Sequence, residues 1–282
     1  MGIAFNIPRI VLPVKRPFNL RTFLALVVLY FLGNLAGVPL LLKTRSSIEP
    51  VWFWGIVTLI SALGIALSLV MADRTSLGLP YLEGYISKGD LQNWLRSGLA
   101  LTALMLIIGL PLGLVVNLNM DGKTYPFGWE LLPASFKAGA VEEIGNRLFL
   151  MSLFVWLGSH IRRDEEKRPA RSVYWAAIIL AGVIFGWAHV DARLGSPAGS
   201  FWWYALIMLV NTIAGIYFGW LFWMIGLEWS MFAHFAYDVF ISMVVIPVYL
   251  LKNPFIWAIL IASLVLAALI AWRFLLRNRQ TA

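Results

Sequence analysis

The chain has no cysteine, and only 13% of its 282 residues are charged. The first absence excludes disulfide bonds and cysteine-ligated metals, so any metal would need histidine and carboxylate ligands. The second places the chain far below the roughly 25% charged residues of soluble domains. The phosphate-binding glycine loop, the Gly-x-Ser-x-Gly turn and the His-Glu-x-x-His helix are missing too. The candidate nucleophile for any hydrolysis is therefore water.

Apolar residues fill most of the chain, at 61% of the total and a mean hydropathy of +0.81. Such a composition indicates that lipid is the main solvent. We expect an all-α polytopic membrane protein, a single domain over residues 1–282 built as one bundle of about eight transmembrane helices. Apolar runs of about 17–25 residues, the length that crosses a bilayer, lie at 22–42, 51–71, 97–117, 132–159, 172–190, 201–226, 229–251 and 254–276.

Lysine and arginine are distributed unevenly between these runs. Alternate segments, starting with the N-terminal one, hold fifteen of them, and the intervening segments hold five. Because basic residues favour the cytoplasmic side, both termini are predicted to be cytoplasmic. The basic N-terminal segment and the absence of cysteine favour a bacterial inner membrane. The net charge of +8 then faces the anionic lipid bilayer and requires no nucleic-acid partner, since the basic residues are scattered over loop ends.

Several ionisable residues lie inside the apolar runs. A charge at the bilayer centre costs roughly 2.5 kcal/mol or more, so each of them is a functional hypothesis. One histidine, His160, ends a run beside Arg162 and is interpreted as interfacial. The candidates that remain are Glu142, Glu143, Arg147, His189, His234 and Asp238.

The strongest local signal is Glu-Glu-x-x-x-Arg at 142–147. Glu143 and Arg147 stand at i, i+4 and share a helix face, while Glu142 points about a quarter turn away. A hydrated helix end would also explain two acidic residues. The small residues at 138–140 favour instead a surface that neighbouring helices approach closely, where buried charge is tolerated.

Two histidine motifs follow. His189 ends Phe-Gly-Trp-Ala-His near the close of the fifth run, and His234 and Asp238 have i, i+4 spacing in the seventh. The carboxylate of Asp238 can therefore orient the imidazole of His234 and fix its tautomer. The alternatives are a structural histidine at 189 and a hydrogen bond at 234–238 that only stabilises a helix contact.

The three motifs in this order resemble the intramembrane CPBP family, which includes type II CAAX prenyl endopeptidases and relatives tied to bacteriocin production and self-immunity. The resemblance covers about residues 130–245, and the small residues from Ala214 to Gly219 are similar to the family's close-packed helix. Many members have Phe before the motif arginine, Gly after it and Asn at the last motif position. This chain has Asn146, Leu148 and Asp238 there.

The resemblance implies a membrane-embedded peptidase with a central catalytic cavity and a peptide or protein substrate. Glu142 and His189 would activate a water, and His234 would stabilise the oxyanion with Asp238 as its partner. Glu143, paired with Arg147, would hold the helix and tune Glu142. No cofactor is expected. As an alternative, Glu142, His189 and His234 could ligate zinc, with water as the fourth ligand.

Two other functions stay open: a noncatalytic scaffold or immunity protein of the same fold, and a proton-coupled transporter. The catalytic interpretation meets one geometric difficulty. If every run simply crosses the membrane, His189 and His234 lie more than about 10 Å apart along the membrane normal. We therefore expect a short, tilted sixth helix whose turn near Glu228 dips into a water-filled cavity; the alternative is a wrong run boundary.

Overall fold

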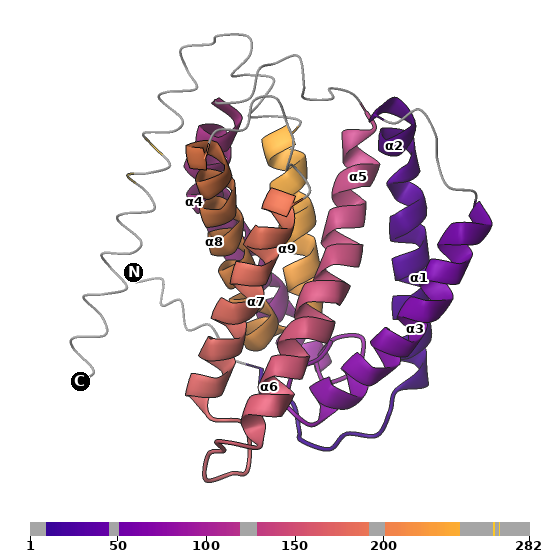
Figure 1. The fold of residues 1–282 in the computed structure, drawn as a ribbon. Helices are drawn as coiled ribbons and strands as arrows, with labels where there is room; N and C mark the ends of the chain where they lie inside the picture. The colour runs from indigo at the N-terminus through magenta and orange to yellow at the C-terminus, as the bar shows by residue number, and fades with distance from the viewer. Residues whose placement is uncertain are drawn as a thin grey trace.

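The structure is a computed structural model that describes residues 10–44, 51–118, 129–191 and 201–242, together with 262 and 265. Within these ranges the chain forms helices joined by turns, and its helices lie side by side in a bundle (Figure 1). This confirms the predicted all-α membrane fold class. The elements are α1 (Leu20–Ala36), α2 (Val38–Thr44), α3 (Val51–Asp73), α4 (Lys88–Leu118), α5 (Leu131–Lys137), η1 (Ala138–Glu142), η2 (Ile144–Met151), α6 (Ser152–Ser159), α7 (Arg171–Asp191), α8 (Phe201–Ile225) and α9 (Leu227–Phe240).

Five helices among the described residues are long and apolar enough to cross a membrane: Leu20–Leu42, Trp52–Asp73, Lys88–Gly113, Arg171–Val190 and Phe201–Ile225. The expected run at 132–159 matches the consecutive elements from α5 to α6. The run at 229–251 begins as α9, but its second half lies outside the described residues. The run at 254–276 also lies outside them apart from 262 and 265, so the count of eight stays a prediction.

Helices α7 and α8 approach each other through glycines. A Cβ built on Gly182 would lie 3.0 Å from the backbone nitrogen of Ile216, and one on Gly215 would lie 2.9 Å from the Cα of Gly182. Any side chain there would push the two backbones apart. The small residues of the sixth run therefore allow the close helix packing that the sequence predicted.

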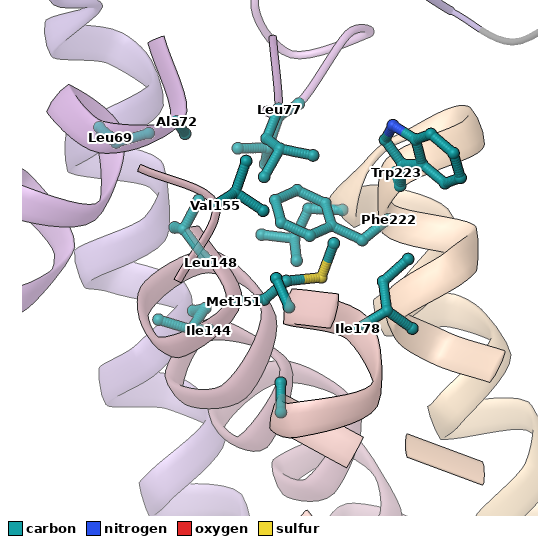
Figure 2. Packing of buried hydrophobic residues seen from close by; sticks show 14 of the residues in the cluster. Leu69, Ala72, Leu77, Ile144, Leu148, Met151, Val155, Ile178, Phe222 and Trp223 are labelled. Carbon is teal, nitrogen blue, oxygen red and sulfur yellow. The ribbon is translucent and has the colours of Figure 1, made fainter. Parts of the chain in front are cut away.

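A buried apolar cluster fills the space between α3, η2, α6, α7 and α8. Figure 2 shows Leu148 and Met151 of η2, Ile178 of α7 and Phe222 of α8 converging below Leu77 from the loop after α3. Each of these side chains is at most 2% exposed. The cluster fixes η2 against α7 and α8, and η2 directly follows the two motif glutamates.

The turn between α8 and α9 is covered by protein. Gly226 has φ 105°, a conformation that favours glycine, and the N–H of Leu227 donates to the carbonyl of Gly78 at 3.1 Å. One Glu228 oxygen accepts the backbone N–H groups of Tyr81 and Leu82, at 3.0 and 3.1 Å. Helix α8 corresponds to the sixth apolar run and spans 25 residues. The expectation of a short sixth helix is therefore wrong. The turn that ends α8 lies beneath the loop after α3, because this loop supplies hydrogen-bond partners for the polar groups at the start of α9.

The N-terminal segment covers this loop in turn. Arg16 forms ion pairs with Asp73 at 2.9 Å and Glu83 at 2.7 Å, and it also donates to the carbonyl of Leu77. Its side chain is 2% exposed. The segment before α1, the end of α3 and the loop that follows therefore form one layer at this end of the bundle.

Candidate active site

Glu142 and Glu143 lie where the helix from α5 to α6 widens into π-helical turns. Glu142 ends η1, Glu143 separates the two π segments, and η2 begins at Ile144. Such wide turns are rare and occur frequently at functional sites. The widening belongs to the segment that carries the strongest sequence motif.

Glu143 is the centre of a buried polar network. Its Oε1 accepts from Nδ1 of His234 at 2.9 Å, and its Oε2 accepts from the hydroxyl of Ser230 at 2.5 Å. The Nε of Arg147 lies 3.3 Å from the same Oε2, in the expected i, i+4 ion pair. The side chains of Glu143 and Arg147 are both 0% exposed. Glu143 therefore joins its own helix to α9.

This contact needs a residue without a side chain at position 139. A Cβ there would lie 2.7 Å from the carbonyl oxygen of Met231 and 2.9 Å from the Cβ of Phe235. Gly139 thus lets η1 lie directly against the backbone of α9. The approach brings the Glu143 carboxylate within reach of both Ser230 and His234, which stand one helical turn apart.

Aromatic rings enclose the buried charges. The guanidinium carbon of Arg147 lies 4.7 Å from the ring centroid of Phe185 on α7 and 5.7 Å from that of Phe218 on α8. The Phe218 ring stacks on the imidazole of His234, with centroids 4.6 Å apart and planes 18° apart. A guanidinium over aromatic faces is stabilised where water is excluded. Rings from α7 and α8 therefore cover the network.

Glu142 and His189 face each other with their side chains partly exposed. The Oε2 of Glu142 lies 4.0 Å from Nε2 of His189, and the two side chains are 36% and 22% exposed. The Nδ1 of His189 lies 2.9 Å from the carbonyl oxygen of Phe185. A carbonyl can only accept, so Nδ1 carries a proton. When the ring is neutral, Nε2 then has its lone pair on the side of Glu142.

Asp238 completes the cluster. One of its carboxylate oxygens lies 3.8 Å from Nε2 of His234, and its side chain is 31% exposed. Asp238 also lies within electrostatic range of Glu142 and His189. The imidazoles of His189 and His234 both contact the Phe185 ring, at centroid distances of 4.4 and 5.7 Å. With Arg147, motif residues from three separate helices thus contact the Phe185 ring.

The geometry differs from the expected one in the partner of His234. His234 donates its Nδ1–H to Glu143, and Asp238 stands near the other ring nitrogen. Ser230 was not among the candidates, although a polar residue one turn before His234 in an apolar run could have indicated it. Asn146 donates to the backbone carbonyl of Glu142 at 3.0 Å, and Leu148 is fully buried in the apolar cluster. His160 lies exposed just after α6, outside this site.

The expected zinc alternative finds little support in the donor geometry. Among the residues that the structure describes, no three histidine, aspartate or glutamate side chains gather as a group able to hold a metal ion. Glu143 has its two oxygens committed to His234, Ser230 and Arg147.

The fold and the site together define a class of protein. It is a helical membrane protein that carries a glutamate–histidine cluster among its helices. Residues 124–240 match the family described as type II CAAX prenyl endopeptidase Rce1-like, a family of proteases. The match confirms the predicted resemblance and covers the whole cluster described above. No curated protein and no solved structure shows a significant match to the chain.

Proposed function

We propose that this protein is an intramembrane endopeptidase in which Glu142 and His189 activate a water. The observation that carries the proposal is the 4.0 Å separation between Oε2 of Glu142 and Nε2 of His189. This distance exceeds that of a direct hydrogen bond and suits two groups that share one water. Both groups are partly exposed, as access to a substrate requires.

The protonation of His189 supports this role. With Nδ1–H directed at the Phe185 carbonyl, Nε2 and the Glu142 carboxylate are both acceptors. A water between them would donate one hydrogen to each and keep a lone pair for attack. Its oxygen would attack the carbonyl carbon of the peptide bond as Glu142 takes its proton. Collapse of the tetrahedral intermediate would then break the C–N bond as protonated Glu142 returns the proton to the leaving nitrogen, giving an amine and a carboxylic acid, which afterwards loses its proton to solvent.

His234 is suited to stabilise the oxyanion. Its Nδ1 is bound to Glu143, so its Nε2 is the nitrogen that would donate to a substrate, in the imidazolium form. Glu143 and Asp238 flank the ring at its two nitrogens and favour that positive form. Donors fixed in advance where charge develops supply much of the stabilisation of an acyl-transfer transition state. In this assignment Glu143 orients His234, and Asp238 supports its charge.

The test uses the full chain in lipid vesicles with membrane-anchored peptides, and new peptide termini are detected by mass spectrometry. We expect Glu142→Gln and His189→Ala each to abolish cleavage, because both side chains activate the water. Thermal stability should be unchanged, because both side chains are partly exposed. His160→Ala is the matched control, since His160 lies exposed outside the site, and it should cleave normally.

Each alternative function predicts a different result. A scaffold would give no product from the unaltered protein under any condition. A transporter would give a proton-dependent flux that Glu142→Gln abolishes, again without a peptide product. Either result would overturn the peptidase assignment. The distribution of basic residues supports a proposal that both termini are cytoplasmic. The cysteine-free chain and its basic N-terminal segment support a bacterial inner membrane.

A further inference from the structure

A polar pocket lies at the end of the bundle where the N-terminal segment, the end of α3 and the end of α6 meet. It has a volume of about 550 Å³, and its basic lining residues are Lys15, Arg16, Arg74, His160 and Arg163. These residues come from three segments that the charge distribution assigns to one side of the membrane. None of them belongs to the glutamate–histidine cluster.

The pocket has an excess of positive charge. The ion pairs of Arg16 with Asp73 and Glu83 carry one positive and two negative charges, so this group contributes a net charge of −1. The other basic side chains of the pocket outweigh it. The guanidinium of Arg163 donates to the carbonyl oxygens of Ser159 and Lys167, at 2.9 and 3.0 Å, which leaves its charge uncompensated. Within the described ranges, no carboxylate pairs with the side chain of Lys15, Arg74 or Arg163. Three cations therefore face one cavity.

The structure holds these cations in place. The backbone N–H of Lys15 donates to the carbonyl of Asp73 at 2.8 Å, and this bond fixes the N-terminal segment against the end of α3. The contacts of Arg163 with Ser159 and Lys167 fix the loop after α6. The basic groups are thus presented by three anchored segments, which lowers the entropic cost of binding an anion.

The apolar part of the pocket indicates what kind of anion fits. Val70 and Trp156 line it, and Val70 continues a row of exposed apolar side chains along α3. Leu63, Leu67 and Val70 are 71%, 60% and 40% exposed, and their i, i+4, i+7 spacing puts them on one helix face. Because α3 spans the membrane by length and composition, this face meets lipid chains just below the cations.

We propose that this pocket binds the phosphate of an anionic phospholipid, with the acyl chains of that lipid lying along the Leu63–Val70 face of α3. Basic pockets between transmembrane helices are known places for acidic lipid headgroups, and each lysine or arginine near an anionic surface strengthens binding about fivefold. The apolar face explains a preference for a lipid over a free anion. The proposal depends on the membrane fold and is independent of the peptidase assignment.

The experiment measures lipid binding to the purified, delipidated full chain by native mass spectrometry and by thermal shift. The probes are phosphatidylglycerol, phosphatidylcholine and inorganic phosphate at equal concentration. We expect phosphatidylglycerol to bind and stabilise the protein, phosphatidylcholine to do so markedly less, and inorganic phosphate to have no effect at this concentration. Added salt should weaken the phosphatidylglycerol effect, because the cations of the pocket are partly exposed.

The paired variant Lys15→Gln with Arg74→Gln should weaken phosphatidylglycerol binding by about 25-fold, fivefold for each charge. The matched control is Lys88→Gln with Arg162→Gln, which removes two exposed cations outside the pocket and should leave binding near that of the parent. Equal losses in both pairs would show general charge attraction and overturn the site.

The proposal can also fail on the unaltered protein alone. Equal binding of phosphatidylglycerol and phosphatidylcholine would remove the role of the anionic headgroup. Stabilisation by inorganic phosphate, with displacement of the lipid, would show a free-anion site instead. These comparisons need no variant and stay decisive even if Lys15→Gln disturbs the backbone at that position, where φ is 63°.

Discussion

Replacing Arg147 by methionine should destabilise the protein strongly, because Arg147 balances a fully buried carboxylate. The side chains of Arg147 and Glu143 are both 0% exposed, and the Nε of Arg147 lies 3.3 Å from Oε2 of Glu143. Removal of one partner of a buried ion pair costs about 3–5 kcal/mol, since the other charge is left without compensation. Methionine keeps much of the arginine volume, so this cost measures charge more than lost packing.

Two features of the site adjust this magnitude. The contacts of the guanidinium with the Phe185 and Phe218 rings add about 2 kcal/mol in a desolvated setting. In the opposite direction, Glu143 keeps its hydrogen bonds to His234 and Ser230, which partly compensate its charge. We therefore expect a loss of about 3–5 kcal/mol, and a fall in Tm on the order of 10 °C if the membrane domain responds as soluble domains of similar size do.

The assay is thermal unfolding in detergent, followed by intrinsic tryptophan fluorescence. Arg162→Met is the control, because Arg162 is exposed just after α6 and its loss should leave Tm unchanged. The double variant Arg147→Met with Glu143→Gln should recover part of the stability, since no buried charge is then stranded. If Arg147→Met melts at the parent temperature, the ion pair contributes nothing and the reasoning is refuted.

Three further predictions concern other parts of the molecule. Prolonged chelation should leave peptide cleavage unchanged, with no stoichiometric metal by elemental analysis; loss of activity that zinc restores would contradict this. Gly139→Ala should destabilise by about 1–3 kcal/mol by overpacking and reduce cleavage as α9 shifts, whereas Gly145→Ala, which has open space around its Cβ position, should be neutral. Arg16→Met should lower Tm more at pH 8 than at pH 5. Burial raises the pKa of Glu83, so acid protonates one of the two carboxylates that the variant leaves without Arg16. An equal loss at both pH values would exclude this cause.

The local part of the site could be predicted from sequence spacing. Glu143 and Arg147 pair because i, i+4 residues share a helix face, and this relation holds within one element whatever surrounds it. The same reasoning put Asp238 next to His234, and their side chains are indeed 3.8 Å apart. It could not reveal that Glu143 bonds the other nitrogen of the ring, because those residues are 91 positions apart.

The relative depth of His189 and His234 in the bundle could not be predicted without the tertiary structure. Counting residues along straight helices separated His189 from His234, yet both imidazoles contact the ring of Phe185. The loop after α3 meets the α8–α9 turn through Gly78 and Glu228. No periodicity within a run predicts such a contact, since it depends on which surface loop folds over the helix ends.

The sequence by itself determined that lipid surrounds most of the chain and that the chain is helical. It also determined the resemblance to the protease family that matches residues 124–240. Composition and periodicity are properties of single segments, and the absence of bulk water in a bilayer core forces apolar segments into helices. Only the tertiary structure decided which carboxylate holds His234, where the α8–α9 turn lies, and that cations from three segments line one pocket. These are contacts between distant segments, fixed by close approach at positions such as Gly139 and Gly182, and a linear pattern does not encode how closely two backbones can pass.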